Sequence, residues 1–344
     1  MQAMSLDQTG EIRKDSKPLI HKVLPDPTPE ADEVLLQVHV CGVCHTELDE
    51  IEGRTAPPSL PVIPGHQVIG RIIALGDRVT KSRLGDRVGV AWIGGACQHC
   101  EFCRSGQENL CTHFTATGRD RNGGYAELMT ARADFVIPIP ESLDDLHAAP
   151  LLCAGAIGYR SLRLTGLQDG QQLGLTGFGA SGRLVLQLVK HQFPNSTVTV
   201  FARSADERTA ALQFGAAWAG DTREIPPAPL DAIIDTTPAW MPVLAALEHL
   251  KPGGRLVINA IRKESSDRSV LATLSYERHL WLEKEIKSVA NVTRADVSEL
   301  LDLAAGIKLH SAVDEYPLAD ANQALIDLRT KPVIAAKVLR IAKD

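Results

Sequence analysis

The stretch QLGLTGFGASGRLVLQLVK, residues 172–190, combines an apolar strand, a glycine-rich turn and an amphipathic helix. Its glycines fit the pattern G-x-G-x-x-G, in which the first permits a tight turn, the second lets the backbone approach a pyrophosphate, and the third lets helix and strand pack closely. The start of the helix adds free N–H groups and the positive end of the helix dipole. The stretch therefore predicts a dinucleotide-binding unit, whose cofactor turn comprises Gly177, Phe178, Gly179, Ala180, Ser181 and Gly182.

Short apolar runs around this turn support the same fold. They occupy residues 173–176, 197–202, 231–237 and 255–261, with helical stretches between them. Strands that alternate with helices predict βαβ units around a parallel sheet. The second half of the chain is therefore predicted to be an α/β domain of Rossmann type, with a doubly wound parallel sheet.

The end of the second strand bears on the choice of cofactor. An acidic residue at this place would grip both ribose hydroxyls of NAD. The chain instead has Ala202, Arg203 and Ser204. Arg203 can pair with a 2′-phosphate, although stacking on adenine or simple solvation would also account for it. The sequence thus predicts binding of NAD(H) or NADP(H), with Arg203 slightly favouring NADP(H) and Asn259 as a further cofactor contact.

Length and charge exclude several classes of protein. A chain of 344 residues exceeds what one compact core usually holds, so two domains are expected. The net charge of −6 disfavours a nucleic-acid partner, which usually requires a basic face. No apolar run is long enough for a bilayer, and residues 1–17 lack the apolar centre of a signal peptide. We therefore expect a cytoplasmic protein with no membrane partner.

The first 150 residues have a different texture from the second half. Alternating or glycine-bounded apolar runs at residues 34–40, 67–75 and 85–92 predict short strands separated by turns. Near the end of the chain, residues 290–306 and 318–330 predict amphipathic helices. These features indicate a β-rich domain that precedes the dinucleotide unit.

All seven cysteines lie before the glycine-rich turn, and four of them are clustered. An odd number of cysteines without an export signal favours metal binding over disulfides. The cluster has the pattern C-x2-C-x2-C-x7-C, and four thiolates so close in sequence can close into one tetrahedral site. There are two alternatives to a zinc site: an iron–sulfur cluster, which also uses four cysteines, and four cysteines without a common role. The sequence predicts a structural zinc site formed by Cys97, Cys100, Cys103 and Cys111.

The three remaining cysteines are Cys41, Cys44 and Cys153. Cys41 and Cys44 are spaced like half a zinc finger or a redox C-x-x-C pair. His66 follows a proline-rich loop and is a further candidate ligand. A catalytic zinc needs three protein ligands and one open position for water or substrate.

Seven motifs together resemble the zinc-dependent medium-chain alcohol dehydrogenases, in the order found in that family. The resemblance covers nearly the whole chain. The motifs are GVCHTEL (42–48), PGHQ (64–67), GDRVGV (85–90), the four-cysteine spacing, GGYAE (123–127), PLLCAG (150–155) and the glycine-rich turn. The resemblance implies a reversible hydride transfer between a primary or small secondary alcohol, or the aldehyde, and a nicotinamide cofactor.

The resemblance also assigns residue roles. It implies that Cys44, His66 and Cys153 bind the catalytic zinc and that Cys41 does not, which gives two zinc ions per chain. Each role has a packing or surface residue as its alternative. The implied roles are a relay hydroxyl for Thr46, a pyrophosphate contact for His45, a carboxylate that holds the zinc-bound histidine for Glu47, and a substrate-pocket wall for Trp92.

Two positions depart from the family pattern. Many members have a histidine where this chain has Asp49, and we expect the carboxylate, or water, to complete the proton relay. Many members also carry glutamate after the zinc-binding histidine, where this chain has Gln67. A neutral amide leaves the metal site less negative by one charge.

The resemblance implies a two-domain α/β architecture and the approximate residue ranges of the two domains. Residues 1–152 would form a GroES-like catalytic domain with its zinc lobe at about 94–112, completed by about 292–344, and residues 153–291 the Rossmann domain. It further implies a homo-oligomer, either a dimer or a tetramer. A polyol dehydrogenase and a non-catalytic zinc-binding protein of the same fold are the alternatives. Neither the physiological alcohol nor the preferred coenzyme follows from the sequence.

Overall fold

The computed structural model describes residues 1–307, 309, 311–331 and 335–342. Seven residues of the predicted C-terminal segment 292–344 lie outside this description, namely 308, 310, 332–334, 343 and 344. The chain forms two compact units. We call Met1–Ala156 with Asn291–Asp344 unit 1, and Ile157–Ala290 unit 2. Residues 153–156 and 291 group with unit 1, so the observed boundaries differ by a few residues from the expected ones.

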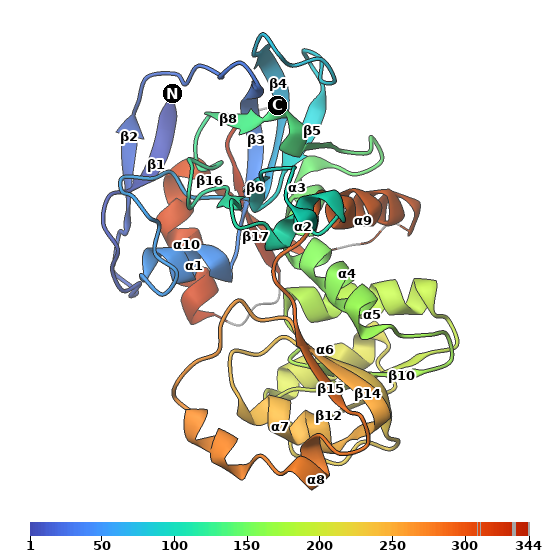
Figure 1. Ribbon diagram of the computed structural model, residues 1–344. Helices are drawn as coiled ribbons and strands as arrows, with labels where there is room; N and C mark the ends of the chain where they lie inside the picture. The colour runs from blue at the N-terminus through green and yellow to red at the C-terminus, as the bar shows by residue number, and fades with distance from the viewer. Residues whose placement is uncertain (308, 310, 332–334, 343–344) are drawn as a thin grey trace. The chain divides into compact units, whose positions relative to one another are not determined.

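Unit 2 is built on one six-stranded parallel sheet, which confirms the predicted Rossmann architecture. Numbered along the sequence, its strands lie in the spatial order 3-2-1-4-5-6 of a doubly wound sheet. The strands, in spatial order, are β12 (Trp218–Gly220), β11 (Thr197–Phe201), β10 (Gln172–Thr176), β13 (Leu230–Asp235), β14 (Leu250–Ile258) and β15 (Glu285–Ser288) (Figure 1).

Helices connect the strands of this sheet, as the parallel crossovers require. Helix α5 (Ala180–Gln192) follows the glycine-rich turn and buries its apolar stripe, including Leu184 and Leu188. Helix α6 (Ala205–Phe214) ends at Gly215, which adopts a left-handed conformation that glycine tolerates without strain. The remaining helical segments are α4 (Ala154–Thr165, which begins in unit 1), α7 (Met241–Glu248), η4 (Arg268–Thr273) and α8 (Tyr276–His279).

Unit 1 contains a seven-stranded sheet in which long β3 (Glu33–Val43) occupies the centre. Alternate residues of β3 are completely buried, as the pattern of the sequence predicts. Strands β17, β4 and β8 all pair antiparallel with β3. Its other strands are β4 (Val68–Leu75), β5 (Arg87–Val90), β8 (Leu128–Arg132), β9 (Val136–Pro138), β16 (Val313–Pro317) and β17 (Ala336–Arg340).

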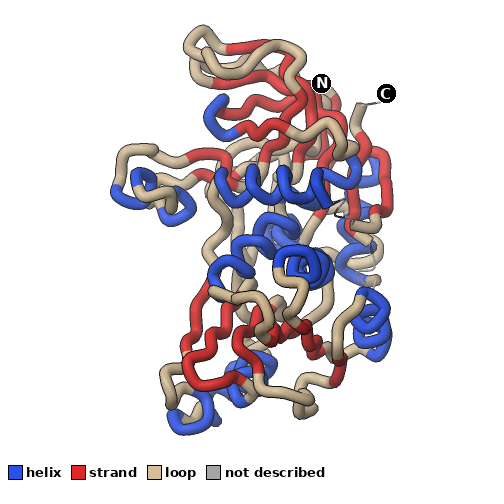
Figure 2. The backbone as a smooth tube through the Cα atoms, turned by 90° about the vertical axis from the view of Figure 1, so that its right-hand side faces the viewer, coloured by secondary structure: helices blue, strands red, loops and turns tan. Residues whose placement is uncertain are grey.

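The C-terminal segment is an integral part of unit 1. Strand β17 pairs with β3, so that Lys337 lies opposite Val43 (Figure 1). Helix α10 (Ala321–Thr330) contacts helix α1 (His45–Ile51), although α10 begins 270 residues after α1 ends (321 − 51). Strand-rich unit 1 also carries the antiparallel pair β1 (Gln2–Leu6) and β2 (Leu19–Val23), and helices α3 (Asp145–Ala148), η3 (Ala149–Leu152), α9 (Arg294–Ile307) and η5 (Leu318–Asp320) (Figure 2).

The four clustered cysteines lie on a small lobe of unit 1. The lobe leaves the unit after β6 (Ile93–Gly95) and returns at β7 (Thr115–Ala116), which pairs with β6. Between them lie only the short helices α2 (Glu101–Arg104) and η1 (Glu108–Leu110). Helix η2 (Ala133–Phe135) follows β8. Among the described residues, no helix combines the length and the apolar character needed to cross a membrane.

Candidate active site and metal centres

Three ligands far apart in sequence meet in unit 1. Cys44 follows β3 and caps helix α1, His66 lies in the loop before β4, and Cys153 follows η3. Their ligand atoms all lie within 4.8 Å of one another. The Cys44 Sγ atom is 3.6 Å from Nε2 of His66 and 3.9 Å from Sγ of Cys153. Tetrahedral Zn²⁺ with bond lengths of about 2.3 Å to sulfur and 2.0 Å to nitrogen requires edges of about 3.5–3.8 Å. The observed spacing fits such an ion.

The charges at this site also favour a cation. The adjacent Cys153 thiol and burial raise the pKa of Cys44 well above its usual value. Burial by itself lowers the pKa of His66, but Glu47 and Cys44 raise it well above its usual value. Two neighbouring sulfurs become thiolates together only when positive charge lies between them. A divalent cation provides that charge.

Glu47 supports two of the three ligands. One carboxylate oxygen accepts the backbone N–H of Cys44 at 2.8 Å, which forms a capping box at the start of α1. The other oxygen lies 2.6 Å from Nδ1 of His66, with both side chains almost completely buried. Since Nδ1 faces the carboxylate, Nε2 is left to face the sulfurs. This is the carboxylate–histidine–metal arrangement of many zinc sites.

Cys41 does not join this group. It is completely buried in β3, and its Sγ lies 3.6 Å from the carbonyl oxygen of Gly42. Burial raises the pKa of the Cys41 thiol well above its usual value, so the thiol stays protonated. Successive strand residues face opposite sides, and the odd spacing of three places Cys41 and Cys44 in different surroundings.

Helix α1 places the remaining predicted residues close to Cys44 in sequence, but in different environments. The N–H of Thr46 donates to Cys44 Sγ at 3.4 Å, and its side chain is partly exposed. His45 is exposed. Asp49 is buried and accepts a hydrogen bond from Nε of Arg54 at 2.5 Å. Arg54 thus occupies one oxygen of the Asp49 carboxyl group.

Trp92 follows β5 and is partly buried. Its ring lies 5.3 Å from the ring of Phe114, at an interplanar angle of 43°. Its indole N–H donates to Oε1 of Glu50 at 3.2 Å. The sequence did not single out Phe114 or Glu50. Glu50 lies one helical turn after Thr46, and this spacing, which places the two residues on the same face of a helix, could have identified Glu50 from the sequence.

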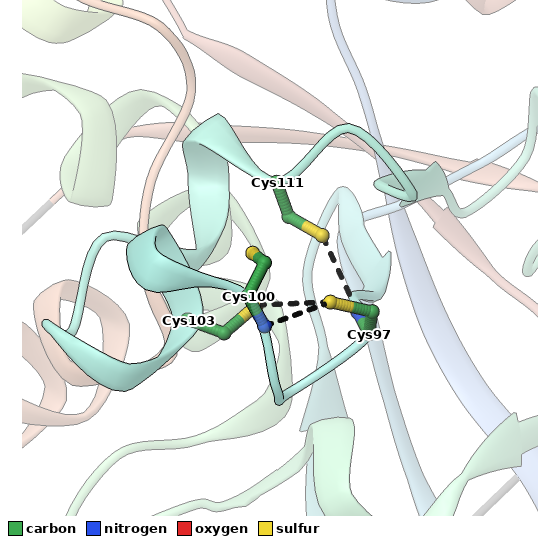
Figure 3. Close-up of side chains that lie close together, drawn as sticks. All are labelled: Cys97, Cys100, Cys103 and Cys111. Atoms are coloured by element: carbon green, nitrogen blue, oxygen red, sulfur yellow. Dashed lines mark hydrogen bonds between the residues drawn. The ribbon is translucent and has the colours of Figure 1, made fainter.

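The four cysteines of the lobe form the second candidate metal centre. Their sulfur atoms lie within 4.8 Å of one another, and those of Cys97 and Cys103 are 3.9 Å apart (Figure 3). A tetrahedral zinc site has sulfur edges of about 3.8 Å. A multi-iron cluster would require wider spacing, because its iron and sulfide atoms lie between the thiolates. The geometry therefore fits a single ion.

Backbone N–H groups stabilise the thiolates of this lobe. The N–H of Cys100 donates to Cys97 Sγ at 3.3 Å, while the N–H groups of Cys97 and His113 donate to Cys111 Sγ. Hydrogen bonds from the backbone at His99 and Cys100 lower the pKa of Cys97 to about 6. Thiolates are the form of cysteine that binds metal, so the local backbone prepares the lobe for an ion.

The glycine-rich turn of unit 2 has the conformation that the motif predicts. Gly177 has φ of +81°, and its N–H donates to the carbonyl oxygen of Phe201. A Cβ on Gly182 would lie 3.1 Å from the Gly177 carbonyl oxygen, whereas nothing lies within 4 Å of a Cβ on Gly179. Helix α5 thus begins with open space at Gly179. Phe178 is completely buried, and its ring packs against that of Phe214.

The predicted nucleotide contacts lie at the carboxyl ends of the strands. Arg203 follows β11 and is exposed, and Arg208 donates to the carbonyl oxygens of Ala202 and Arg203 at 2.8 and 2.9 Å. Arg208 thereby adds a second guanidinium near the place of the missing acidic residue. Asn259 follows β14, and its buried Nδ2 has no partner among the described residues.

These units define a class of protein. A doubly wound sheet with a glycine-rich turn is a dinucleotide-binding fold, and the three-ligand set leaves the fourth position of a tetrahedral metal open. The combination is that of a metal-dependent dehydrogenase.

Comparisons with known proteins specify the family. Residues 30–141 match the alcohol dehydrogenase GroES-like domain. The chain is 42% identical to a probable alcohol dehydrogenase of Mycobacterium tuberculosis, over 99% of this chain and 97% of that protein. It is 33% identical to an alcohol dehydrogenase of Geobacillus stearothermophilus, over 95% and 97%. A cinnamyl alcohol dehydrogenase structure from Sorghum bicolor superposes with a TM-score of 0.82 at 27% identity, covering 98% of this chain and 97% of that one. The chain belongs to the zinc-dependent medium-chain alcohol dehydrogenase family, as its motifs predicted.

Proposed function

We propose that this protein catalyses reversible hydride transfer between a primary or small secondary alcohol, or its aldehyde, and a nicotinamide cofactor. The observation that carries the proposal is the set of Cys44, His66 and Cys153, whose spacing fits three corners of a tetrahedral ion. Zn²⁺ held there would act as a Lewis acid that makes loss of the alcohol proton feasible near neutral pH. The hydride chemistry belongs to the cofactor.

Residues of α1 prepare this site. Glu47 fixes the ring of His66 and the start of the helix, so that the ligand atoms are held in place before a metal binds. The Thr46 hydroxyl, two residues after Cys44, takes the alcohol proton and passes it outward. Asp49 is tied to Arg54, so we assign the outward step to water rather than to this carboxylate.

We assign a structural zinc to Cys97, Cys100, Cys103 and Cys111, which completes two zinc ions per chain. The support is the sulfur spacing of the lobe and its N–H···S hydrogen bonds. All four positions of this ion are filled by protein, so it serves folding rather than catalysis. All seven cysteines are free thiols. Metal thiolates persist under reducing conditions, which supports a cytoplasmic location.

Unit 2 is proposed to bind the nicotinamide cofactor, with its pyrophosphate on the N–H groups of the glycine-rich turn. His45 is proposed as a further pyrophosphate contact, and Asn259 as a further cofactor contact. Arg203 favours NADP(H), because the residues directly after β11 are Ala202, Arg203 and Ser204, with no acidic side chain at the place where NAD(H) binding requires one. If so, Arg203→Ala raises KM for NADPH by about tenfold more than KM for NADH.

We propose a homo-oligomer formed along β15, the last strand of the unit 2 sheet. All four residues of β15 are exposed, and so are the apolar side chains of Trp281 and Leu282. Antiparallel pairing of two copies about Ile286 places Glu285 opposite the partner's Lys287, which matches opposite charges. Ile286→Arg is expected to convert the oligomer to monomers in sedimentation equilibrium, and an unchanged mass contradicts this assignment.

Zinc content and turnover measured together test the proposed function. The purified chain should hold two zinc ions and oxidise NADH or NADPH in the presence of benzaldehyde or hexanal. The two coenzymes, compared at equal concentration, decide the preference that Arg203 predicts. One zinc ion without any turnover would leave the lobe assignment intact and refute the catalytic role of Cys44, His66 and Cys153.

A further inference from the structure

Glu50 is an acidic side chain in an unusual position, and the proposed function gives it no role. It lies in α1, one turn after Thr46, and only 1% of it is exposed. Its Oε1 accepts the indole N–H of Trp92 at 3.2 Å. Its Oε2 is also buried and has no partner among the described residues. A carboxyl group in these surroundings is costly unless it is uncharged or serves a purpose.

Several charged and titratable groups from different segments of unit 1 affect the pKa of Glu50. Burial and the nearby charge of Glu47 raise its pKa, whereas His66, the hydrogen bond from Trp92 and Arg119 lower it, and the resulting pKa is about 8. Tyr125, whose buried hydroxyl has no partner among the described residues, also interacts with it. These surroundings therefore favour the protonated, uncharged form of the Glu50 carboxyl group.

Arg119 does not neutralise this carboxyl group directly. Its guanidinium donates to Asp120 at 2.6 Å and to the carbonyl oxygen of Thr55 at 3.2 Å. The closest polar contact of Glu50 is therefore the indole of Trp92.

The bond to Glu50 fixes the plane of the Trp92 ring. A tryptophan has one polar atom, and a buried indole N–H normally requires a partner. In Trp92 this atom is held by Glu50, while the ring lies against Phe114 at 5.3 Å. The backbone of Trp92 is held as well, because its carbonyl oxygen accepts the N–H of Thr117. Loss of the bond to Glu50 would free the ring to turn and would leave a buried donor unpaired.

We propose that Glu50 is a positioning residue that orients the indole of Trp92 and thereby sets the preference of the enzyme for flat, aromatic alcohols over small aliphatic ones. The proposal rests on the proposed function, in which Trp92 lines the substrate pocket. The geometric basis of the proposal is independent of the reaction. It consists of the hydrogen bond from Trp92 to Glu50 and the buried Oε2 of Glu50, which has no partner among the described residues.

The first test measures the bond itself on the zinc-loaded full chain, without substrate. The chain has four tryptophans, so 15N-tryptophan labelling gives four indole N–H signals, and Trp92→Phe identifies the one of interest. We expect this signal to move with pH with a midpoint near 8. The movement should vanish in Glu50→Gln, whose amide oxygen accepts the N–H but does not titrate.

Glu52→Gln is the matched control for this measurement. Glu52 follows the same helix, but its carboxylate pairs with Arg54 and accepts the N–H of Ile12. The titration of the Trp92 signal should persist in this variant. A Trp92 signal that is constant from pH 6 to 10, or that titrates equally in Glu50→Gln, overturns the proposal.

The second test compares two substrates. Glu50→Leu removes the acceptor, and we expect KM for benzyl alcohol to rise about three- to tenfold more than KM for 1-propanol, with a smaller change in kcat. Glu50→Gln should restore most of the lost preference. Equal losses for both substrates overturn the proposal. If no alcohol is oxidised at all, the proposed function fails, whereas the indole titration still decides the role of Glu50.

Discussion

The two cysteine-containing sites of unit 1 differ in how the chain assembles them. The lobe draws all four ligands from residues 97–111, on one loop with short helical turns. The other site draws Cys44, His66 and Cys153 from three separate segments. Local loops can set sulfur positions by themselves, whereas the second site exists only when β3, β4 and η3 are packed together. The ligands of the lobe can therefore come together through local structure, whereas those of the three-ligand site come together only through long-range packing.

The support around the metal differs in the same way. In the lobe, backbone N–H groups donate to the sulfurs of Cys97 and Cys111, and the ligands are mostly half-buried. At the other site, a buried side chain, Glu47, holds the ligand His66. Backbone support comes with local conformation, but a buried carboxylate must be placed by the tertiary structure. The first arrangement suits stability, and the second suits a tuned reactive site.

The largest expected effect comes from removal of one ligand at the three-ligand site. Cys153→Ser should lower the zinc content from two to one and reduce kcat/KM by about a thousandfold or more, because the metal supplies several kcal/mol of transition-state stabilisation. Metal analysis and steady-state kinetics measure both. Cys41→Ala is the matched control, since this buried cysteine contacts no proposed metal and should retain both ions.

The next effect separates the two sites by stability. In the double variant Cys100→Ser, Cys103→Ser the lobe loses its ion, and the melting temperature should fall by about 10 °C, since metal binding drives the folding of such lobes. The zinc that remains should still support turnover. Calorimetry and zinc analysis check this expectation. A variant that keeps two zinc ions would show that the lobe is not a metal site.

Removal of the carboxylate that supports the histidine should have an intermediate effect. Glu47→Gln keeps the size of the side chain but weakens its hold on His66, and we expect a 10- to 100-fold loss of zinc affinity or activity. Competition with a chelator measures the affinity. The lobe ion serves as an internal reference, because its affinity should not change. Equal losses at both sites would point to general destabilisation instead.

The smallest effect concerns the missing glutamate. The Gln67 side chain packs closely against Gly42, and a glutamate of the same shape fits the space. Gln67→Glu adds a negative charge to a site that already contains the carboxyl group of Glu47 beside His66. We expect the apparent pKa in the pH dependence of kcat/KM to rise by roughly half to one unit, because a more negative site disfavours loss of the alcohol proton. An unchanged or lower pKa contradicts this expectation.

Sequence reasoning was strongest where the decisive residues are neighbours in the chain. The glycine-rich turn has the predicted conformation at Gly177, and the parallel sheet around it has the predicted order. It was weaker in helix α1. There the sequence offered Asp49 or water for the proton relay, which stays a prediction, and it gave no sign that Asp49 accepts from Arg54 or that Glu50 accepts the indole N–H of Trp92. Helical spacing alone does not reveal which of two adjacent carboxylates meets an arginine.

The sequence by itself determined the Rossmann unit, the four-cysteine lobe and the family of this protein, because each follows from residues whose spacing fixes their geometry. The resemblance already implied which residues are ligands, but only the tertiary structure shows the ligand atoms of Cys44, His66 and Cys153 within 4.8 Å of one another, and Glu50 buried beside Trp92. Such contacts depend on the pairing of β3 with β4 and β17, which brings together residues that lie far apart in the chain. The physical reason is that burial and charge pairing are properties of the packed chain, not of any local pattern.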